Sequence, residues 1–175
     1  MENKSEDIIY WTRLKHDEWH MYVAATAVGL CYIGSPNAPF EELEMWGRKR
    51  LPIYRLKEDL EVLQPYISEI IDYLEGRSKA FTFSMDLHGT PFQQAVWKAL
   101  QALEYGQIVT YTDIAECIGR PKSVRAVGSA IGANPVLIFV PCHRVIAKSG
   151  KLGGFRAGLE MKERLLQLEK KDFDR

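Results

Sequence analysis

The segment at residues 140–145 (VPCHRV) places a cysteine directly beside a histidine, a pairing suited to nucleophilic chemistry. The thiolate is the reactive form of cysteine, and a nearby base shifts a thiol towards it. Cys142 follows an apolar run over 134–140 (NPVLIFV), which predicts a buried, strand-like segment of the kind found beside active sites. Cys142 is therefore the candidate nucleophile, with His143 beside it. Taken alone, such a pair is more often a structural buried cysteine with an exposed histidine.

The other cysteines and histidines lack the spacing of a disulfide framework or a metal site. The three cysteines are odd in number, lie far apart and form no CxxC pair. His16 and His20 lie four residues apart beside a strand-like stretch, where we expect surface side chains. The sequence contains neither a glycine-rich phosphate loop nor a nucleotide-binding fingerprint. It thus predicts no metal ion and no cofactor.

The composition is that of a folded globular chain. The 175 residues are 46% hydrophobic and 26% charged, with no net charge, which excludes disorder as the dominant state. The least polar stretch, residues 21–34, is shorter than the roughly 18–20 residues that a bilayer-spanning helix needs. Residues 1–9 lack the apolar region of a signal peptide, so we expect a cytoplasmic protein.

The charges are distributed unevenly along the chain. Residues 1–90 carry 15 acidic and 10 basic side chains, whereas residues 91–175 carry 8 acidic and 13 basic ones. Within residues 105–158 there are seven basic and two acidic side chains. This basic half favours a polyanionic partner, although a solvated basic face would have the same composition.

The patterns of the first half predict an α/β unit. Residues 8–14 and 19–34 are rich in aromatic and β-branched side chains and predict strands, as does the alternating segment 81–87. Residues 40–50 predict a short polar helix. The three- and four-residue spacing of apolar side chains over 60–74 predicts an amphipathic helix.

The second half predicts helices. Residues 87–90 are the expected linker, which divides the chain into domains of residues 1–88 and 89–175. Residues 91–103 predict an amphipathic helix with a proline in its first turn, and residues 159–171 predict a final helix.

Two short predicted helices, residues 110–119 and 122–132, are separated by a glycine and a proline and predict a helix-turn-helix. After Lys122, the second helix combines small side chains with one long basic residue, Arg125. Such a helix can bring its backbone close to a DNA groove while the arginine reaches further. Small side chains also suit tight helix packing, so this pattern alone leaves both interpretations open.

Longer segments of the sequence carry a family resemblance. The string PCHRV at 141–145 is preceded at seven residues by Asn134-Pro135. Around it stand GTPFQQAVWKAL (89–100), YGQIVTYTDIAECIGRPKSVRAVGSAIGANP (105–135) and GGFRAGLEMKERLLQLE (153–169). In order and spacing these segments resemble the O6-alkylguanine-DNA alkyltransferases, or methylated-DNA–protein-cysteine methyltransferases. The first 80 residues resemble the family's N-terminal domain only in length and pattern.

The resemblance implies a DNA repair protein that its own reaction consumes. Such a protein binds duplex DNA through a helix-turn-helix in the minor groove and flips O6-alkylguanine into a pocket. Its cysteine takes the alkyl group irreversibly; O4-alkylthymine is an additional candidate substrate. The resemblance also implies a ribonuclease-H-like N-terminal α/β domain and a mainly α C-terminal domain with a winged helix-turn-helix. It further implies a monomer with no obligate protein partner and no membrane association.

Carried onto the matching positions, the resemblance implies roles for five side chains. Cys142 is the alkyl acceptor, and His143 is its base through a bridging water. Glu169 holds the histidine in the productive tautomer. Tyr111 donates a proton toward guanine O6 as the alkyl group leaves. Asn134 is the hinge that ties the helix-turn-helix to the active-site segment.

For the DNA, the resemblance implies that Arg125 enters the base stack in place of the flipped base. The implied DNA-contacting residues are Tyr111, Lys122, Ser123, Arg125, Ala126 and Gly128. The implied pocket residues are Pro141, Val145, Phe155 and Arg156. Many relatives have a tyrosine at the position of Phe155 and a small residue at that of Arg156. We therefore expect Arg156 to narrow or recharge the pocket mouth, and Arg144 to form a structural ion pair.

Two functions of other classes are the alternatives. A DNA-lesion sensor or regulator would use the same fold without transfer, but relatives of that kind lack the cysteine that stands in PCHRV here. In a cysteine hydrolase the histidine usually lies far from the cysteine in sequence, because adjacent side chains of an extended segment point apart. Turnover on an ester or amide would indicate a hydrolase, and one reaction per chain would indicate a transferase.

Overall fold

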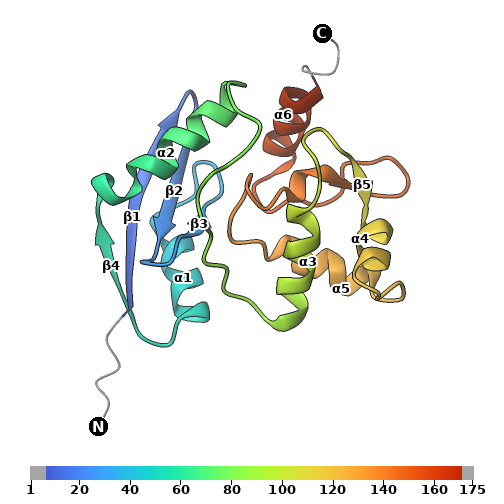
Figure 1. Ribbon diagram of the computed structural model, residues 1–175, viewed down its shortest axis with the longest axis horizontal. Helices are drawn as coiled ribbons and strands as arrows, with labels where there is room; N and C mark the ends of the chain where they lie inside the picture. The colour runs from blue at the N-terminus through green and yellow to red at the C-terminus, as the bar shows by residue number, and fades with distance from the viewer. Residues whose placement is uncertain (1–6, 171–175) are drawn as a thin grey trace.

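The computed structural model of the protein describes residues 7–170, and its N-terminal half is built on a four-stranded sheet (Figure 1). The strands are β1 (Asp7–His16), β2 (Trp19–Ala25), β3 (Leu30–Ile33) and β4 (Tyr54–Glu58), in the order β3-β2-β1-β4. β1 pairs antiparallel with β2 and parallel with β4, and β2 pairs antiparallel with β3. The predicted strand over 19–34 is two strands joined by a turn, and β4 was not predicted.

The sheet is covered by a helix on each face because its strands alternate apolar side chains between two clusters. Met21 and Val23 of β2 pack with α2 (Leu60–Leu74). Ala24, the residue after Val23, packs instead with α1 (Phe40–Arg50). Both helices lie where the sequence predicts them. The side chain of Asp59 caps α2 by accepting a hydrogen bond from the Val62 N–H.

The C-terminal half is mainly helical, and Figure 1 shows its helices packed beside the sheet half. Its helices are α3 (Pro91–Gln101), α4 (Tyr111–Cys117), α5 (Val124–Gly132) and α6 (Leu159–Lys170), with a 3₁₀ turn η1 (Cys142–Arg144). Thr90 and Thr110 form capping boxes at the first turns of α3 and α4. The indole of Trp97 donates to the Ala130 carbonyl at 2.8 Å, which fixes α3 against α5.

A two-stranded parallel sheet joins the start of the helix pair α4–α5 to the cysteine segment. β5 (Val109–Thr110) pairs with β6 (Val145–Ile146). β5 leads directly into Tyr111, and β6 follows directly after η1. The pairing therefore brings the first residue of α4 towards the Cys142 turn.

Two predicted strands are wrong. Residues 81–87 form a single bridge, Leu30 to Met85, because β3 is four residues long. Residues 134–140 are a buried turn with one bridge, Ile33 to Val136. Within it Ile138 has a φ of 75°, and the Val140 N–H donates to the Val136 carbonyl, which closes the segment on itself. The apolar run is thus explained by burial rather than by a strand.

One core runs through both halves of the molecule. The largest cluster of buried side chains includes Val23 and Ile70 of the sheet half together with Trp97, Val127 and Leu165 of the helical half. The proposed boundary near residue 88 is consequently crossed by continuous packing. Over the described stretch 7–170, no helix has both the length and the apolar character needed to cross a membrane.

Candidate active site

Cys142 opens the η1 turn at the centre of the molecule and is almost completely buried, with 3% of its surface exposed. Burial raises the pKa of its thiol, while the side chain of Asn134 lowers it. The resting form is accordingly the thiol, and reaction requires a base to remove its proton. Cys31 is also buried and Cys117 is exposed; both are free.

Asn134 holds the cysteine turn in place. Its Nδ2 donates to the Val140 carbonyl at 2.8 Å and to Sγ of Cys142 at 3.1 Å. Its Oδ1 accepts from the Val136 N–H at 2.9 Å. Asn134 follows the C-cap residue of α5, so these bonds connect the end of α5 to the cysteine turn. The role of Asn134 as a hinge stays a prediction.

His143 and Glu169 form a buried pair. Nε2 of His143 lies 2.7 Å from Oε1 of Glu169, and the two side chains are 0% and 1% exposed. A carboxylate accepts hydrogen bonds only, so Nε2 carries the ring proton in the neutral tautomer. Nδ1 is buried and bonds to no group of the described chain. Nδ1 is therefore the nitrogen available to take a proton.

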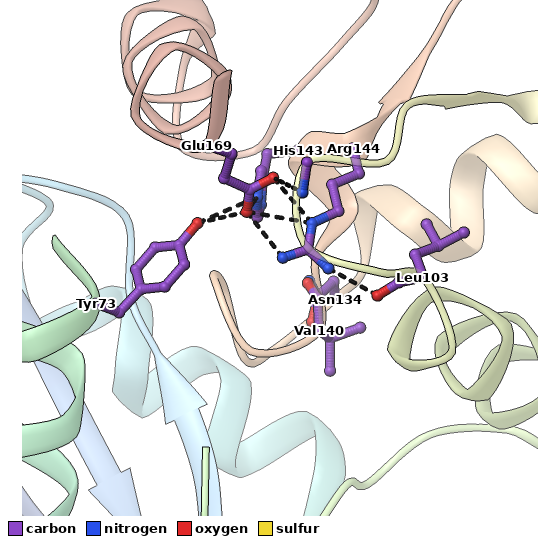
Figure 2. A network of polar contacts seen from close by, with 8 residues as sticks. Tyr73, Leu103, Asn134, Val140, His143, Arg144 and Glu169 are labelled. Atoms are coloured by element: carbon purple, nitrogen blue, oxygen red, sulfur yellow. Dashed lines mark hydrogen bonds and ion pairs between the residues drawn. The ribbon is translucent and has the colours of Figure 1, made fainter. Parts of the chain in front are cut away.

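Glu169 is the centre of a larger network (Figure 2). The guanidinium of Arg144 donates to both carboxylate oxygens at 2.8–3.1 Å and to the Leu103 carbonyl at 2.8 Å. The hydroxyl of Tyr73 donates to Oε1 at 2.6 Å, and the Gly106 N–H donates to Oε2 at 3.2 Å. Arg144 thus forms the structural ion pair that the sequence predicted.

The electrostatics of this network keep the histidine neutral and the glutamate charged. Burial opposes the ionisation of Glu169, but hydrogen bonds from His143 and Arg144 outweigh it and lower its pKa to about 2. Burial lowers the pKa of His143, although Glu169 opposes that effect. A neutral imidazole beside an ionised carboxylate is the arrangement of a general base.

Tyr111 and the loop after β6 lie against each other. The Tyr111 hydroxyl donates to the Gly154 carbonyl at 3.4 Å, and a Cβ added at Gly153 would lie 2.8 Å from that hydroxyl oxygen. Burial raises the pKa of Tyr111, and the negative charge of an ionised Cys142 raises it further. The Tyr111 hydroxyl therefore stays protonated at neutral pH and lies near enough to Cys142 for the charge of the cysteine to affect its pKa.

Lys162 is a buried cation near the cysteine that the sequence analysis missed. Its side chain is 0% exposed, and Nζ donates to the carbonyls of Val145 and Leu152. Burial lowers its pKa, and an ionised Cys142 opposes that effect. Lys162, Leu165 and Glu169 are spaced by three and four residues, so two charged residues on the buried face of α6 were the available signal.

The residues expected to contact DNA lie at the N-terminal end of α5 and on its exposed face. Lys122, Arg125 and Ala126 are exposed, and Ser123 and Gly128 are partly exposed. Gly128 faces the ring of Tyr111, which a Cβ there would approach to 3.8 Å. The helix therefore presents small side chains and one arginine next to Tyr111.

Of the expected pocket residues, Val145 is buried within β6 and Phe155 packs on the core. Pro141 lines a surface groove with Phe81 and Phe139, between the two halves. Arg156 turns away towards the sheet half: its guanidinium donates to Glu42 Oε1 at 2.8 Å and to the Ile33 carbonyl at 2.9 Å. The arginine thus bridges to the sheet half, while its positive charge still lowers the pKa of Cys142, and its effect on the pocket mouth stays a prediction.

Tyr73 is a second residue that the sequence analysis missed. Its place on the apolar face of α2 marked it as core, and only the fold brings its hydroxyl to Glu169. For metals, the structure between residues 7 and 170 groups no three His, Cys, Asp or Glu side chains in a way that could hold an ion.

Comparison with known proteins places this site in a family. The DNA-binding domain of 6-O-methylguanine DNA methyltransferases matches residues 91–171. The inducible methylated-DNA–protein-cysteine methyltransferase of Bacillus subtilis is 55% identical over 163 residues, which span 93% of this chain and 91% of that protein.

Two solved structures superpose on this protein along most of its length. The O6-methylguanine methyltransferase of Mycobacterium tuberculosis is 34% identical and superposes with a TM-score of 0.81, covering 93% of each chain. A crystal structure of Mycobacterium tuberculosis OGT in complex with DNA has a TM-score of 0.78 at 34% identity, covering 94% of this chain and 93% of that one. The chain belongs to the methylated-DNA–protein-cysteine methyltransferase family.

Proposed function

We propose that the protein repairs duplex DNA by transferring the alkyl group of O6-alkylguanine, methyl above all, to its own Cys142. The observation that carries this proposal is the buried constellation of Cys142, Asn134, His143 and Glu169 in one chain of this family. A thioether forms and is not hydrolysed, so each chain reacts once. O4-alkylthymine is a second candidate substrate for the same thiolate.

In the proposed reaction the thiol proton leaves through a water to Nδ1 of His143. Glu169 holds the opposite ring nitrogen and stabilises the imidazolium that forms. The N–H of Asn134 that points at Sγ stabilises the thiolate, and Lys162 adds positive charge nearby. The thiolate then attacks the alkyl carbon as its bond to O6 breaks.

The guanine that leaves needs a proton, because an anionic guanine is a poor leaving group. We assign that donation to Tyr111, whose hydroxyl stays protonated at neutral pH because burial raises its pKa. The imidazolium returns the proton to Tyr111 through solvent. Overall, the proton of the thiol ends on guanine and the alkyl group ends on sulfur.

For recognition, we assign α4 and α5 to a helix-turn-helix in the minor groove. Arg125 replaces the flipped base in the stack, and Lys122, Ser123, Ala126 and Gly128 approach the backbone. Exposed basic side chains at Arg120, Lys148 and Lys151 support a polyanionic partner. Val145 and Phe155 are the proposed pocket wall, with Pro141 beside it.

The finer architecture belongs to the same proposal. The strand order β3-β2-β1-β4 supports a ribonuclease-H-like N-terminal domain over 1–88. The parallel pair β5–β6 beside α4–α5 supports a winged helix-turn-helix in a domain over 89–175. A monomer suffices because a single chain supplies every proposed catalytic side chain, and we place the protein in the cytoplasm with the DNA it repairs.

Substitution of the cysteine tests the proposal. The Cys142→Ala variant should bind an O6-methylguanine duplex with wild-type affinity and transfer nothing, and Cys117→Ala, at an exposed cysteine, should transfer normally. Methyl transfer measured with a radiolabelled duplex distinguishes the two. Residual transfer by Cys142→Ala would contradict the assignment, and repeated turnover of an ester by the wild type would indicate the hydrolase alternative.

A further inference from the structure

Tyr73 touches the His143–Glu169 pair from outside the helical half. It stands in the last turn of α2, is fully buried, and donates its hydroxyl to Oε1 of Glu169 at 2.6 Å. The hydroxyl oxygen of Tyr73 lies 3.4 Å from Nε2 of His143. In Figure 2 the ring of Tyr73 points from α2 across to the carboxylate, opposite the side from which Arg144 approaches.

The hydroxyl is held on this target by its surroundings. The Tyr73 ring packs against Phe81 at 5.5 Å and, edge to face, against Tyr105 at 6.1 Å between ring centroids. Burial raises the pKa of Tyr73 well above its usual value, and the charge of Glu169 raises it further. The group therefore stays a hydrogen-bond donor at any pH at which the protein works.

The hydrogen bond from Tyr73 affects His143 because both residues bond to Oε1 of Glu169. Glu169 also accepts from Arg144 and from the Gly106 N–H, and each donor withdraws negative charge from the carboxylate. Among the donors to Glu169 in the described residues, Tyr73 is the one that comes from the sheet half. The sheet half thus shapes the acceptor that His143 faces.

We propose that Tyr73 is a positioning residue for the transfer reaction: it holds Oε1 of Glu169 on Nε2 of His143 and limits how strongly that carboxylate favours a protonated ring. The inference rests on the proposed function, in which His143 must accept the thiol proton and give it up again. It assigns the N-terminal half a part in the chemistry beyond covering the helical half.

The pH dependence of the reaction reports on this arrangement. His143 is faced by Glu169 and Lys162 of α6, by Arg144 of its own turn, and by Tyr73 of α2. Glu169 favours the protonated ring, whereas Arg144 and Lys162 disfavour it. Removing the Tyr73 hydroxyl leaves a more basic carboxylate, so His143 becomes protonated at a higher pH and loses its function as a base there.

The test compares Tyr73→Phe with Tyr54→Phe. Tyr54 also donates a hydroxyl hydrogen bond within the sheet half, to the Glu44 carbonyl at 3.1 Å, and it has no part in the site. Transfer from an O6-methylguanine duplex is measured between pH 5 and 8. In Tyr73→Phe we expect the acid limb to move up by about half to one pH unit and the plateau to fall about 3- to 10-fold, the size of one ordinary hydrogen bond's contribution. Tyr54→Phe should retain the wild-type limb and plateau.

A second variant, expected to move the acid limb in the opposite direction, keeps the proposal testable if Tyr73→Phe misfolds. Site-specific 3-fluorotyrosine at position 73 retains the hydroxyl but is more acidic, hence a stronger donor, and should move the acid limb to lower pH. An acid limb that is unchanged in either protein overturns the proposal, even if the rate falls with stability. The titration of His143 followed by nitrogen NMR must shift in the same directions and needs no DNA. If the wild type failed to transfer, the proposed function would fail, whereas this titration would still decide the role of Tyr73.

Discussion

At the scale of single residues, the site depends on a buried carboxylate whose charge is matched from several directions. Glu169 is 1% exposed and is bonded by His143, Arg144, Tyr73 and the Gly106 N–H. An unpaired charge at this position would be strongly destabilising, because burial removes its hydration. The same bonds that stabilise the fold orient the histidine.

This matching predicts a pH dependence of stability. The pKa of Glu169 is about 2 in the folded protein, below its usual value of 4.5, so its contribution to stability is complete above pH 4.5 and is lost as the pH falls towards 2. Between pH 6 and 3 the wild type should lose about 2 kcal/mol more unfolding free energy than Glu169→Gln.

Urea unfolding at several pH values measures this difference. Glu160→Gln, on the exposed side of the same helix, is the control and should retain the wild-type slope. Equal slopes for Glu169→Gln and the wild type would show that the carboxylate is not held in its charged form by the fold.

At the scale of elements, short backbone segments bring the candidate catalytic residues close to one another. The two-residue strands β5 and β6 place Tyr111 by the cysteine turn, and the loop that follows β6 packs on Tyr111. Gly153 in this loop has a φ of 73° and leaves no room for a Cβ beside the Tyr111 hydroxyl. The position of the Tyr111 side chain therefore depends on a glycine.

Replacement of Gly153 distinguishes the effect of the contact with Tyr111 from the effect of backbone strain. Gly153→Ala should lower the transfer rate at least 10-fold, because the new methyl group displaces Tyr111. Gly150→Ala has a similar positive φ of 86° but no atom within 4 Å of its Cβ, so it should lose about 1 kcal/mol of stability and little activity. Single-turnover kinetics and thermal unfolding of both variants are the measurements. Equal activity losses would mean that strain, and not Tyr111, is responsible.

The sequence predicted the elements that carry strong local signals. Thr90 with Pro91 marked the start of α3, and the apolar period over 60–74 marked α2, as the structure confirms. It failed where tertiary contacts decide. Residues 134–140 have a strand's composition, yet the side chain of Asn134 and the φ of Ile138 close them into a turn. Two-residue strands such as β5 have no period to detect.

The candidate site, like the fold, was predicted only in part from the sequence. The adjacency of Cys142 and His143 is visible in sequence, and the family resemblance supplied Glu169 and Asn134. Tyr73 could not be found, because its hydroxyl meets Glu169 across 96 residues of chain and only the docking of α2 on the helical half joins them.

At the scale of the whole molecule, the two halves are joined by buried polar bonds as well as by the core. Tyr73 links α2 to α6, and Arg156 links the loop after β6 to Glu42 of α1. Two of the seven basic residues in 105–158 form ion pairs within the protein: Arg144 with Glu169, and Arg156 with Glu42. The exposed basic residues, among them Arg125 of α5, remain available to a polyanionic partner.

Arg125 predicts a difference between substrates. In Arg125→Ala, transfer from a methylated duplex should fall about 10- to 100-fold, because nothing offsets the cost of unstacking the flipped base. Transfer from free O6-benzylguanine should be unchanged, since no base has to be flipped. Arg48→Ala, an exposed arginine of α1, is the matched control. Equal losses on both substrates would indicate that Arg125 supports the fold instead.

The most direct measurement is the intact mass of the protein after incubation with an oligonucleotide duplex carrying one O6-methylguanine, followed by peptide mapping. The result expected here is a gain of one methyl group on the peptide that contains Cys142, saturating at one per chain. An unchanged mass in the presence of clear DNA binding would contradict transfer and leave a lesion-binding protein. Methylation of Cys31 or Cys117 would contradict the assignment of the site.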